Sequence, residues 1–297
     1  MNIIGLGTQQ EFLLKHTVSV NGHLGSVMSS VLPHLEWLEK TSTFTSSCGR
    51  PITVYSLKHD AMNAAVMSAW AKHFRNHYCL DNELPYLKNP SKSNSEYLLT
   101  ERFPDEKKKP GPSVRAGDFA EILIADYLEY VRDYNVPRTR YDRKIVTDES
   151  AKGSDVIAFK KQADVISDTD ELLVFEVKAK ASEHQKVNVL QAAIDHSGKD
   201  EVRLAESLNA MRQRLYDRRD FDGIQVVDRF QREADHPCKR SYGAAAVFTA
   251  SSMHEEIIKC STTAKHPSAG SLELIVVGGA QLMTLVHELY RRAADEA

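Results

Sequence analysis

Glu176 and Lys178 place a carboxylate and an ammonium group two residues apart, at the end of an apolar run. The run, ELLVFEVKAK at residues 171–180, has the Leu, Val and Phe residues that are typical of a buried strand. Because strand side chains alternate between faces, we expect Glu176 and Lys178 on one face and Phe175 and Val177 on the other. Two charges on one face of a buried strand generally pair with each other or hold a metal. The alternative is a strand end that emerges into water.

A second carboxylate, Asp155, lies in the segment KGSDVIAF at residues 152–159, which predicts the preceding strand. The polar residues 160–171 would turn the chain back, so the two strands would be antiparallel and Asp155 would lie opposite Glu176. A competing interpretation places a strand at residues 163–166 and makes Asp164 the relevant acid. The longer apolar run after Asp155 favours Asp155, which leaves Asp164 as a solvated loop residue.

A third carboxylate, Glu121, belongs to a predicted helix at residues 117–128. Glu121 shares one helical face with Ile124, Ala125 and Leu128, because these residues follow it at helical spacing. An acid on an apolar face points toward the protein interior. The helix and the two strands would therefore bring three carboxylates together.

The order of a helix with Glu121, a strand with Asp155 and a strand with Glu176 and Lys178 resembles the PD-(D/E)xK nuclease superfamily. More narrowly, residues 113–295 resemble the HamA family, the nuclease subunits of the bacterial Hachiman anti-phage system. The sequence departs from the superfamily pattern in two ways. Ser154 stands where the name-giving proline would be, and the spacing between Asp155 and Glu176 is long.

The resemblance implies an α/β fold, with a restriction-endonuclease-like mixed sheet flanked by helices, and a metal-dependent DNA endonuclease. Its implied metal ligands are Asp155, Glu176, Glu121 and the carbonyl of Val177, which would hold Mg²⁺ or Mn²⁺ through oxygen atoms. Lys178 would position the attacking water, so the implied catalytic residues are Asp155, Glu176, Lys178 and Glu121. The implied partners are DNA and a superfamily 2 helicase, HamB-like, which would gate the nuclease in a heterocomplex.

Two other functions remain open. A nuclease-fold subunit could bind DNA or a partner without cutting, with Glu176 and Lys178 as a structural ion pair. A glycosidase that uses two carboxylates fits less well, because the lysine has no role in its chemistry.

The composition is that of an ordinary globular protein, with 297 residues, 42% of them hydrophobic and 27% charged. The net charge of -3 provides no global attraction to nucleic acid, so DNA binding would need a local basic surface or a partner. The four cysteines are widely spaced, which argues against a zinc module and for reduced thiols. Without a long apolar run or a secretion signal, we expect a cytoplasmic protein.

Three segments are predicted along the chain: an N-terminal α+β docking domain at residues 1–90, a linker or exposed loop at 91–113, and the nuclease-like domain at 114–297. The first contains a predicted strand at 52–55 and a helix at 60–78. His73 and His77 lie one helical turn apart, with His59 nearby, but no further Cys or carboxylate follows at ligand spacing. We therefore expect surface or helix-capping histidines.

The remaining elements are predicted from their apolar spacing. A strand is expected at residues 141–146, a helix at 199–219, strands at 243–250 and 271–278, and a closing helix at 280–292. The helix at 199–219 carries five arginines that would contact DNA phosphates or form a solvated face: Arg203, Arg212, Arg214, Arg218 and Arg219.

Overall fold

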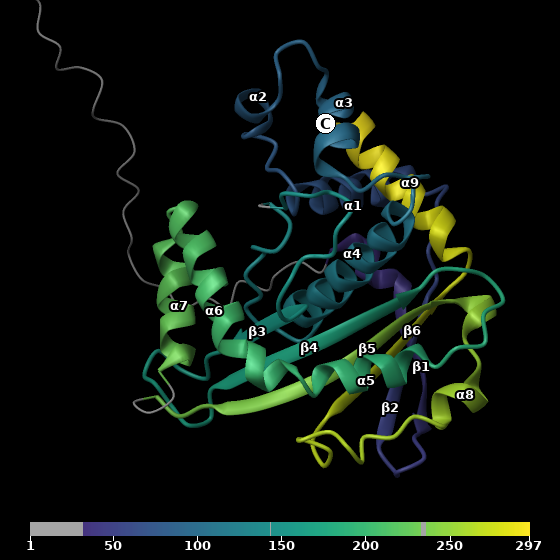
Figure 1. The fold of residues 1–297 in the computed structure, drawn as a ribbon, viewed down its shortest axis with the longest axis vertical. Helices are drawn as coiled ribbons and strands as arrows, with labels where there is room; N and C mark the ends of the chain where they lie inside the picture. The colour runs from purple at the N-terminus through teal and green to yellow at the C-terminus, as the bar shows by residue number, and fades with distance from the viewer. Residues whose placement is uncertain (1–31, 143, 233–235) are drawn as a thin grey trace, which may run out of the picture. The chain divides into compact units, whose positions relative to one another are not determined.

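One mixed sheet forms the centre of the computed structural model, which describes residues 32–142, 144–232 and 236–297. Its strands are β1 (Leu38–Thr45), β2 (Pro51–Leu57), β3 (Val156–Lys160), β4 (Glu171–Lys180), β5 (Lys239–Thr249) and β6 (Glu273–Gly279). They lie in the order β1-β2-β6-β5-β4-β3 (Figure 1). The pairs from β2 to β4 are parallel, whereas β1 and β3 pair antiparallel at the two edges. The predicted mixed α/β sheet is confirmed.

Helices cover both faces of the sheet. The α-helices are α1 (Ala64–Asn76), α2 (Leu84–Leu87), α3 (Asn94–Tyr97), α4 (Gly111–Asp126), α5 (Val189–Ser197), α6 (Asp200–Asp217), α7 (Phe221–Gln231), α8 (Glu255–Lys259) and α9 (Leu282–Asp295). Short 3-10 or π turns are η1 (Pro33–Trp37), η2 (Leu98–Arg102), η3 (Tyr127–Val131) and η4 (Ala250–Ser252). One core contains the apolar residues of α1, α4 and α9, and the other contains those of α5, α6 and α7. Figure 1 shows α4 and α5 on opposite sides of β4.

Strand β4 divides its side chains between these two cores. Phe175 and Val177 belong to the core under α4, and Leu172 and Val174 belong to the core under α5 and α6. Glu176 and Lys178 therefore face the α5 and α6 side, as strand alternation predicts. Both flanking cores are needed to bury β4, and this explains its nearly continuous apolar sequence.

A close approach between β4 and β5 depends on a glycine. Gly243 is paired in register with Phe175, and the Phe175 ring occupies the space that a Cβ at position 243 would need. The aromatic ring thus covers the glycine and fills the core on that face. No other residue fits at this position without displacing the ring.

Several predicted elements are confirmed with small changes in their ends. The predicted helices at 60–78, 199–219 and 280–292 correspond to α1, α6 and α9, and the predicted strands at 243–250 and 271–278 correspond to β5 and β6. The predicted strand at 141–146 is wrong, because its described residues form no strand. Side-chain contacts hold this segment instead: the Tyr141 hydroxyl donates a hydrogen bond to Glu121.

The sheet does not divide near residue 90, where the sequence predicts a domain boundary. β2 pairs with β6 over Ile52–Leu57, so residues before the boundary extend the same sheet as residues after it. The predicted linker is also partly interior, because Tyr97, Leu98 and Phe103 are buried in the core beside α9. The described residues from 32 to 297 cluster as one unit. The docking role of residues 1–90 stays a prediction, and residues 1–31 lie outside the described part of the chain.

None of the helices in the described ranges combines the length and the apolar character that crossing a bilayer requires.

Candidate active site

Asp155 lies directly before β3, at the carboxyl end of β4. β3 pairs with β4 only as far as Val156 and Phe175, so the next residues of β4 have no strand partner on that side. The Val177 amide instead donates a hydrogen bond to Asp155 Oδ2 at 2.9 Å. Asp155 is thus held against the Glu-x-Lys segment, as the predicted hairpin requires.

Glu176 and Lys178 form an ion pair on the face of β4 that is covered by α5 and α6. Glu176 is buried, and its Oε1 also lies 3.4 Å from Nδ1 of His196, near the end of α5. Burial and the neighbouring Asp155 raise the pKa of Glu176 to about 7, although Lys178 opposes this shift. Burial lowers the pKa of Lys178, but the hydrogen bond to Glu176 and the charges of Asp155, Glu176 and Glu121 together outweigh this effect, so the net shift is upward and the lysine stays charged.

Glu121 points inward from α4, as its helical spacing predicts. Its Oε2 accepts hydrogen bonds from Arg140 Nε at 2.6 Å and from the Tyr141 hydroxyl at 2.5 Å. Burial raises the pKa of Glu121 to about 8; Arg140 opposes this shift and Asp155 adds to it. Glu121 is therefore a buried acid whose charge depends on the neighbouring arginine.

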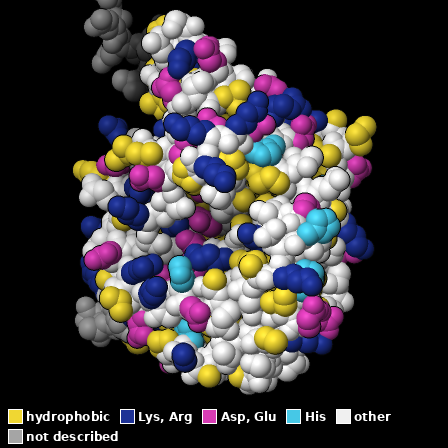
Figure 2. Space-filling model, turned by 45° about the vertical axis from the view of Figure 1, so that its right-hand side comes forward, with side chains coloured by type: hydrophobic (Ala, Val, Ile, Leu, Met, Phe, Trp, Pro, Cys, Tyr) yellow, Lys and Arg dark blue, Asp and Glu magenta, His cyan; other side chains and the backbone are white. Residues whose placement is uncertain are grey.

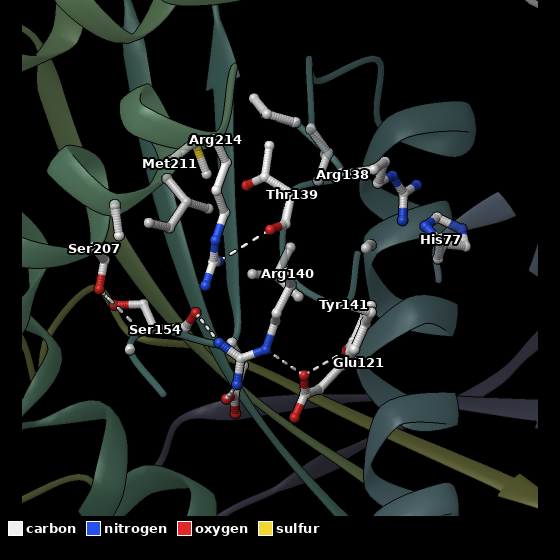
Figure 3. A pocket seen from close by; sticks show the side chains of 18 of the residues that line it. His77, Glu121, Arg138, Thr139, Arg140, Tyr141, Ser154, Ser207, Met211 and Arg214 are labelled. Carbon is white, nitrogen blue, oxygen red and sulfur yellow. Dashed lines mark hydrogen bonds and ion pairs between the residues drawn. The ribbon is translucent and has the colours of Figure 1, made fainter. Parts of the chain in front are cut away.

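Arg140 lies between Glu121 and Asp155, and the sequence analysis did not single it out. Its Nη2 donates to Asp155 Oδ1 at 2.7 Å and to the Ala151 carbonyl at 2.9 Å, while Nη1 donates to the Ser154 carbonyl at 2.7 Å. Figure 3 shows the guanidinium reaching Glu121 on one side and the Ser154 segment on the other. One cation thus pairs with two of the three predicted carboxylates and holds the chain before β3.

The loop before Asp155 is fixed by α6. Gly153 has a φ of +94°, which favours glycine, and a Cβ there would lie 2.9 Å from Ser207 Oγ. The Ser154 amide donates to the same Ser207 hydroxyl at 3.0 Å. The Lys-Gly-Ser-Asp sequence therefore forms a turn whose backbone, rather than its side chains, places Asp155.

Asp200, the first residue of α6, is a further buried carboxylate at the site. Burial raises the pKa of Asp200 to about 6, with Ser154 opposing the shift and Asp155 adding to it. The same residue also contributes to the raised pKa of Glu176. An acid at the start of the predicted helix at residues 199–219 is the signal that would have identified it.

Asp164 lies in the loop between β3 and β4, away from this group of carboxylates. The Asp164 carbonyl accepts a hydrogen bond from Arg229 of α7 at 3.0 Å, and Asp164 is exposed. Residues 163–166 form no strand. The structure therefore agrees with the interpretation that places Asp155, rather than Asp164, opposite Glu176.

A pocket beside Asp155 is lined by Glu121, Arg140, Ser207 and Arg214 (Figure 3). Of the five arginines predicted along α6, only Arg214 lines it, and its Nη1 donates to the Thr139 carbonyl at 2.9 Å. Arg212 and Arg218 form ion pairs with Asp228 and Asp142, while Arg203 and Arg219 are exposed. Most of this positive charge is thus used within the protein.

The oxygen donors at the site fit a hard divalent cation. Asp155 helps to raise the pKa of Glu176, so the two carboxylates are close enough to disfavour each other's charge, and a cation between them would offset this. The amide and carbonyl of one strand residue point to the same side, so the Val177 carbonyl faces Asp155 as well. Glu121 fits less directly, because Arg140 lies between it and Asp155.

The arrangement can be compared with known proteins. The HamA family model matches residues 33–293, a longer segment than the resemblance recognised from residue 113 onward. No curated protein matches the chain. Because the family match includes every strand of the sheet and the residues Glu121, Asp155, Glu176 and Lys178, the chain belongs to the HamA family.

Proposed function

We propose that this HamA protein is a metal-dependent DNA endonuclease of the PD-(D/E)xK type, and the effector subunit of a Hachiman anti-phage defence complex. The observation that carries the proposal is the convergence of Asp155, Glu176 and Lys178 in the carboxyl half of β4. The Val177 amide holds Asp155, Glu176 pairs with Lys178, and α6 begins beside them. Membership of the HamA family supports the defence role.

Phosphodiester hydrolysis needs an activated water and positive charge near the phosphate. Mg²⁺ or Mn²⁺, when bound by Asp155, Glu176 and the Val177 carbonyl, would supply a Lewis acid at the phosphate. Lys178 keeps its charge beside Glu176 and would hold the attacking water while offsetting negative charge on the phosphate. Glu121, with a pKa of about 8, accepts a hydrogen bond from Arg140. It would orient this arginine, which also contacts Asp155, and would hydrogen-bond to a water molecule on the metal.

A plasmid-cutting assay with Mg²⁺, and with EDTA in a parallel reaction, tests the proposal. With the helicase partner and ATP present, we expect cutting by the wild type that EDTA abolishes, and no cutting by Glu176→Gln or Lys178→Met. Lys239→Met is the matched control, because Lys239 pairs with Glu171 at the opposite end of β4. Two results contradict the proposal. One is a wild-type protein that does not cut DNA with or without the helicase and ATP, and the other is cutting that survives in Lys178→Met.

A second function, DNA or partner binding without cutting, is favoured by the ion pairs within the site. Lys178 pairs with Glu176, and Arg140 pairs with both Glu121 and Asp155, so each of the three carboxylates already has a cationic partner within the chain. In that case Glu176→Gln and Lys178→Met would alter stability and leave binding unchanged. DNA binding by the wild type without strand cleavage, in Mg²⁺ or Mn²⁺, would favour this function.

A partner is part of the proposal because the chain alone has weak electrostatic attraction for DNA. The net charge is -3, and Figure 2 shows basic and acidic side chains interspersed on the visible face. We propose a HamB-like superfamily 2 helicase as the subunit that delivers DNA and gates cutting. Exposed apolar side chains in the predicted docking region are candidates for its contact surface: Met62, Leu80, Tyr86, Leu87 and Leu99.

Co-expression with a neighbouring helicase gene, followed by size-exclusion chromatography, tests the partnership. We expect co-elution, and DNA cutting that depends on the helicase and its ATP hydrolysis. Tyr86→Ser with Leu87→Ser should weaken co-elution, whereas Val202→Ser, an exposed apolar residue on α6, should not. Separate elution together with full cutting by the isolated chain would contradict gating by a helicase.

A further inference from the structure

Two histidines of α1 and an aspartate of α4 meet outside the proposed nuclease carboxylates. His73 and His77 lie one turn apart on and directly after α1, and Asp126 is the last residue of α4. His73 Nε2 lies 3.2 Å from His77 Nε2 and 2.9 Å from Asp126 Oδ1. His77 is the C-cap residue of α1, as the helix-capping alternative predicts, but it is buried, with 4% of its surface exposed.

Hydrogen bonds leave the nitrogen atoms of the two histidines poorly paired. His73 Nε2 carries either one proton or one lone pair, and it contacts both a carboxylate oxygen and a second imidazole nitrogen. With the proton on His73, a single N–H would be shared by two acceptors. With the proton on His77, a bare nitrogen would face the Asp126 carboxylate. A cation among the three atoms would accept a lone pair from each.

The spacing agrees with metal coordination. The ligand atoms of His73, His77 and Asp126 all lie within 4.8 Å of one another. Two ligands at about 2.0–2.1 Å from a tetrahedral Zn²⁺ are separated by roughly 3.3 Å, close to the 3.2 Å between the two imidazole nitrogens. We propose that His73, His77 and Asp126 form a binding site for a divalent transition-metal ion, with Zn²⁺ the best fit to this ligand set.

The residues around the cluster suit this site. His34 of η1 lies with Nε2 3.2 Å from Asp126 Oδ2 and stacks on Trp70, so the second carboxylate oxygen is oriented by a buried imidazole. Burial holds the pKa of His77 well below its ordinary value, which keeps its nitrogen available as a ligand. About a fifth of the His73 side chain is exposed, so water can complete the coordination.

Arg138 is the cation already beside this cluster, and its charge is shared with another acid. Its Nη2 donates to Asp126 Oδ1 at 2.8 Å, while Nε and Nη2 both donate to Glu129 Oε2. With neutral histidines, Asp126, Glu129 and Arg138 together carry one net negative charge. A divalent ion would therefore enter a negatively charged site, and Arg138 would keep its contact with Glu129.

The ion would join α1 to α4, the helix that also carries Glu121. His77 and Glu121 line the same pocket, and Figure 3 shows His77 next to Arg138 at its edge. The imidazole ligands separate this site from the all-oxygen site proposed around Asp155 and Glu176. The metal site would stabilise the helix pair, and it does not depend on nuclease activity.

Zinc content and cobalt spectra of the full-length protein test the inference. After chelation, addition of Zn²⁺ and gel filtration, we expect about one zinc ion per wild-type chain and a raised Tm. His77→Gln and Asp126→Asn should lose this zinc, whereas His59→Gln and Glu176→Gln should retain it. His59 is the control histidine, because it hydrogen-bonds to the Ala280 carbonyl outside the cluster.

The wild-type Co²⁺ spectrum decides the question even where a variant fails to fold. Tetrahedral nitrogen and oxygen ligation gives intense visible bands, whereas a carboxylate and water site gives weak ones. Weak bands, no zinc in the folded wild type, or zinc retained in folded His77→Gln would overturn the inference. Glu176→Gln that retains zinc but no longer cuts plasmid would support both the zinc site and the separate nuclease site. Because zinc content and cutting are measured independently, either proposal can fail without the other.

Discussion

Arg140 and Asp155 form an ion pair at the edge of the sheet, with Nη2 of the arginine 2.7 Å from Oδ1 of the aspartate. The same guanidinium holds Glu121 at 2.6 Å through Nε, so α4 and the start of β3 are connected through one side chain. Burial opposes the charge on Arg140, but Glu121 and Asp155 outweigh it and shift its pKa upward. Arg140 thus contacts both carboxylates and connects the two segments that carry them.

Replacement of Arg140 by Ala should destabilise the protein by about 3 kcal/mol or more, because it leaves Glu121 and Asp155 buried without a cation. Urea unfolding measures this change. Arg212→Ala is the matched control: its pair with Asp228 leaves the arginine side chain 51% exposed, and its loss should cost less than about 1 kcal/mol. Equal shifts in the two variants would show that Arg140 is not a buried structural cation.

Asp155→Asn should lower DNA cutting by roughly 10³-fold or more, because it removes a negatively charged ligand oxygen from the site. Asp164→Asn should cut like the wild type, since Asp164 lies in an exposed loop. Cleavage rates with Mg²⁺ under activating conditions compare the two variants. Loss of activity in Asp164→Asn alone would assign the metal aspartate to the loop.

The contribution of Glu176 to the stability of the metal-free protein should fall as the pH rises from about 5 to about 8. The pKa of Glu176 is raised from 4.5 to about 7, so in that interval the folded protein holds a proton that the unfolded chain releases. The stabilisation is therefore present at low pH and is lost as the pH passes about 7. Glu121, with a pKa raised to about 8, acts in the same direction.

Unfolding midpoints in EDTA across this interval test the pH dependence. Glu176→Gln should flatten the decline by up to about 3 kcal/mol, because glutamine does not titrate. Glu255→Gln, which removes an exposed partner of Lys259 on α8, should keep the wild-type slope. A Glu176→Gln variant that keeps the wild-type dependence of stability on pH would contradict the prediction.

Gly243→Ala should destabilise the protein by about 1–3 kcal/mol, because the added methyl group meets the Phe175 ring in a packed core. Gly117→Ala is the control, since a Cβ at this position of α4 meets no atom within 4 Å. That substitution should instead stabilise the helix by roughly 0.5–1 kcal/mol. Thermal unfolding separates the two effects, and a neutral Gly243→Ala would mean that the ring moves freely.

Local patterns in the sequence identified the elements that carry Glu121, Asp155, Glu176 and Lys178. The alternation along β4, the apolar run after Asp155 and the helical spacing around Glu121 each report which side of an element is buried. β3 and β4 are also close in the chain, so their antiparallel pairing follows from one turn. These features depend on short stretches of sequence, and the structure agrees with them.

Contacts between distant or irregular segments required the tertiary structure. β2 joins the sheet by pairing with β6, more than 200 residues later, so no local pattern marks β1 and β2 as part of the same sheet. Arg140 lies in a segment without helix or strand, where no periodicity identifies a buried side chain. His73 and His77 meet Asp126 only because α1 and α4 pack on the same face of the sheet. The sequence by itself determined which helices and strands carry the acids and the lysine of the site. Long-range packing decided that Arg140 contacts these acids and that His73 and His77 meet Asp126. The physical reason is that the periodicity of an element shows which of its sides is buried but not which other segment packs against that side.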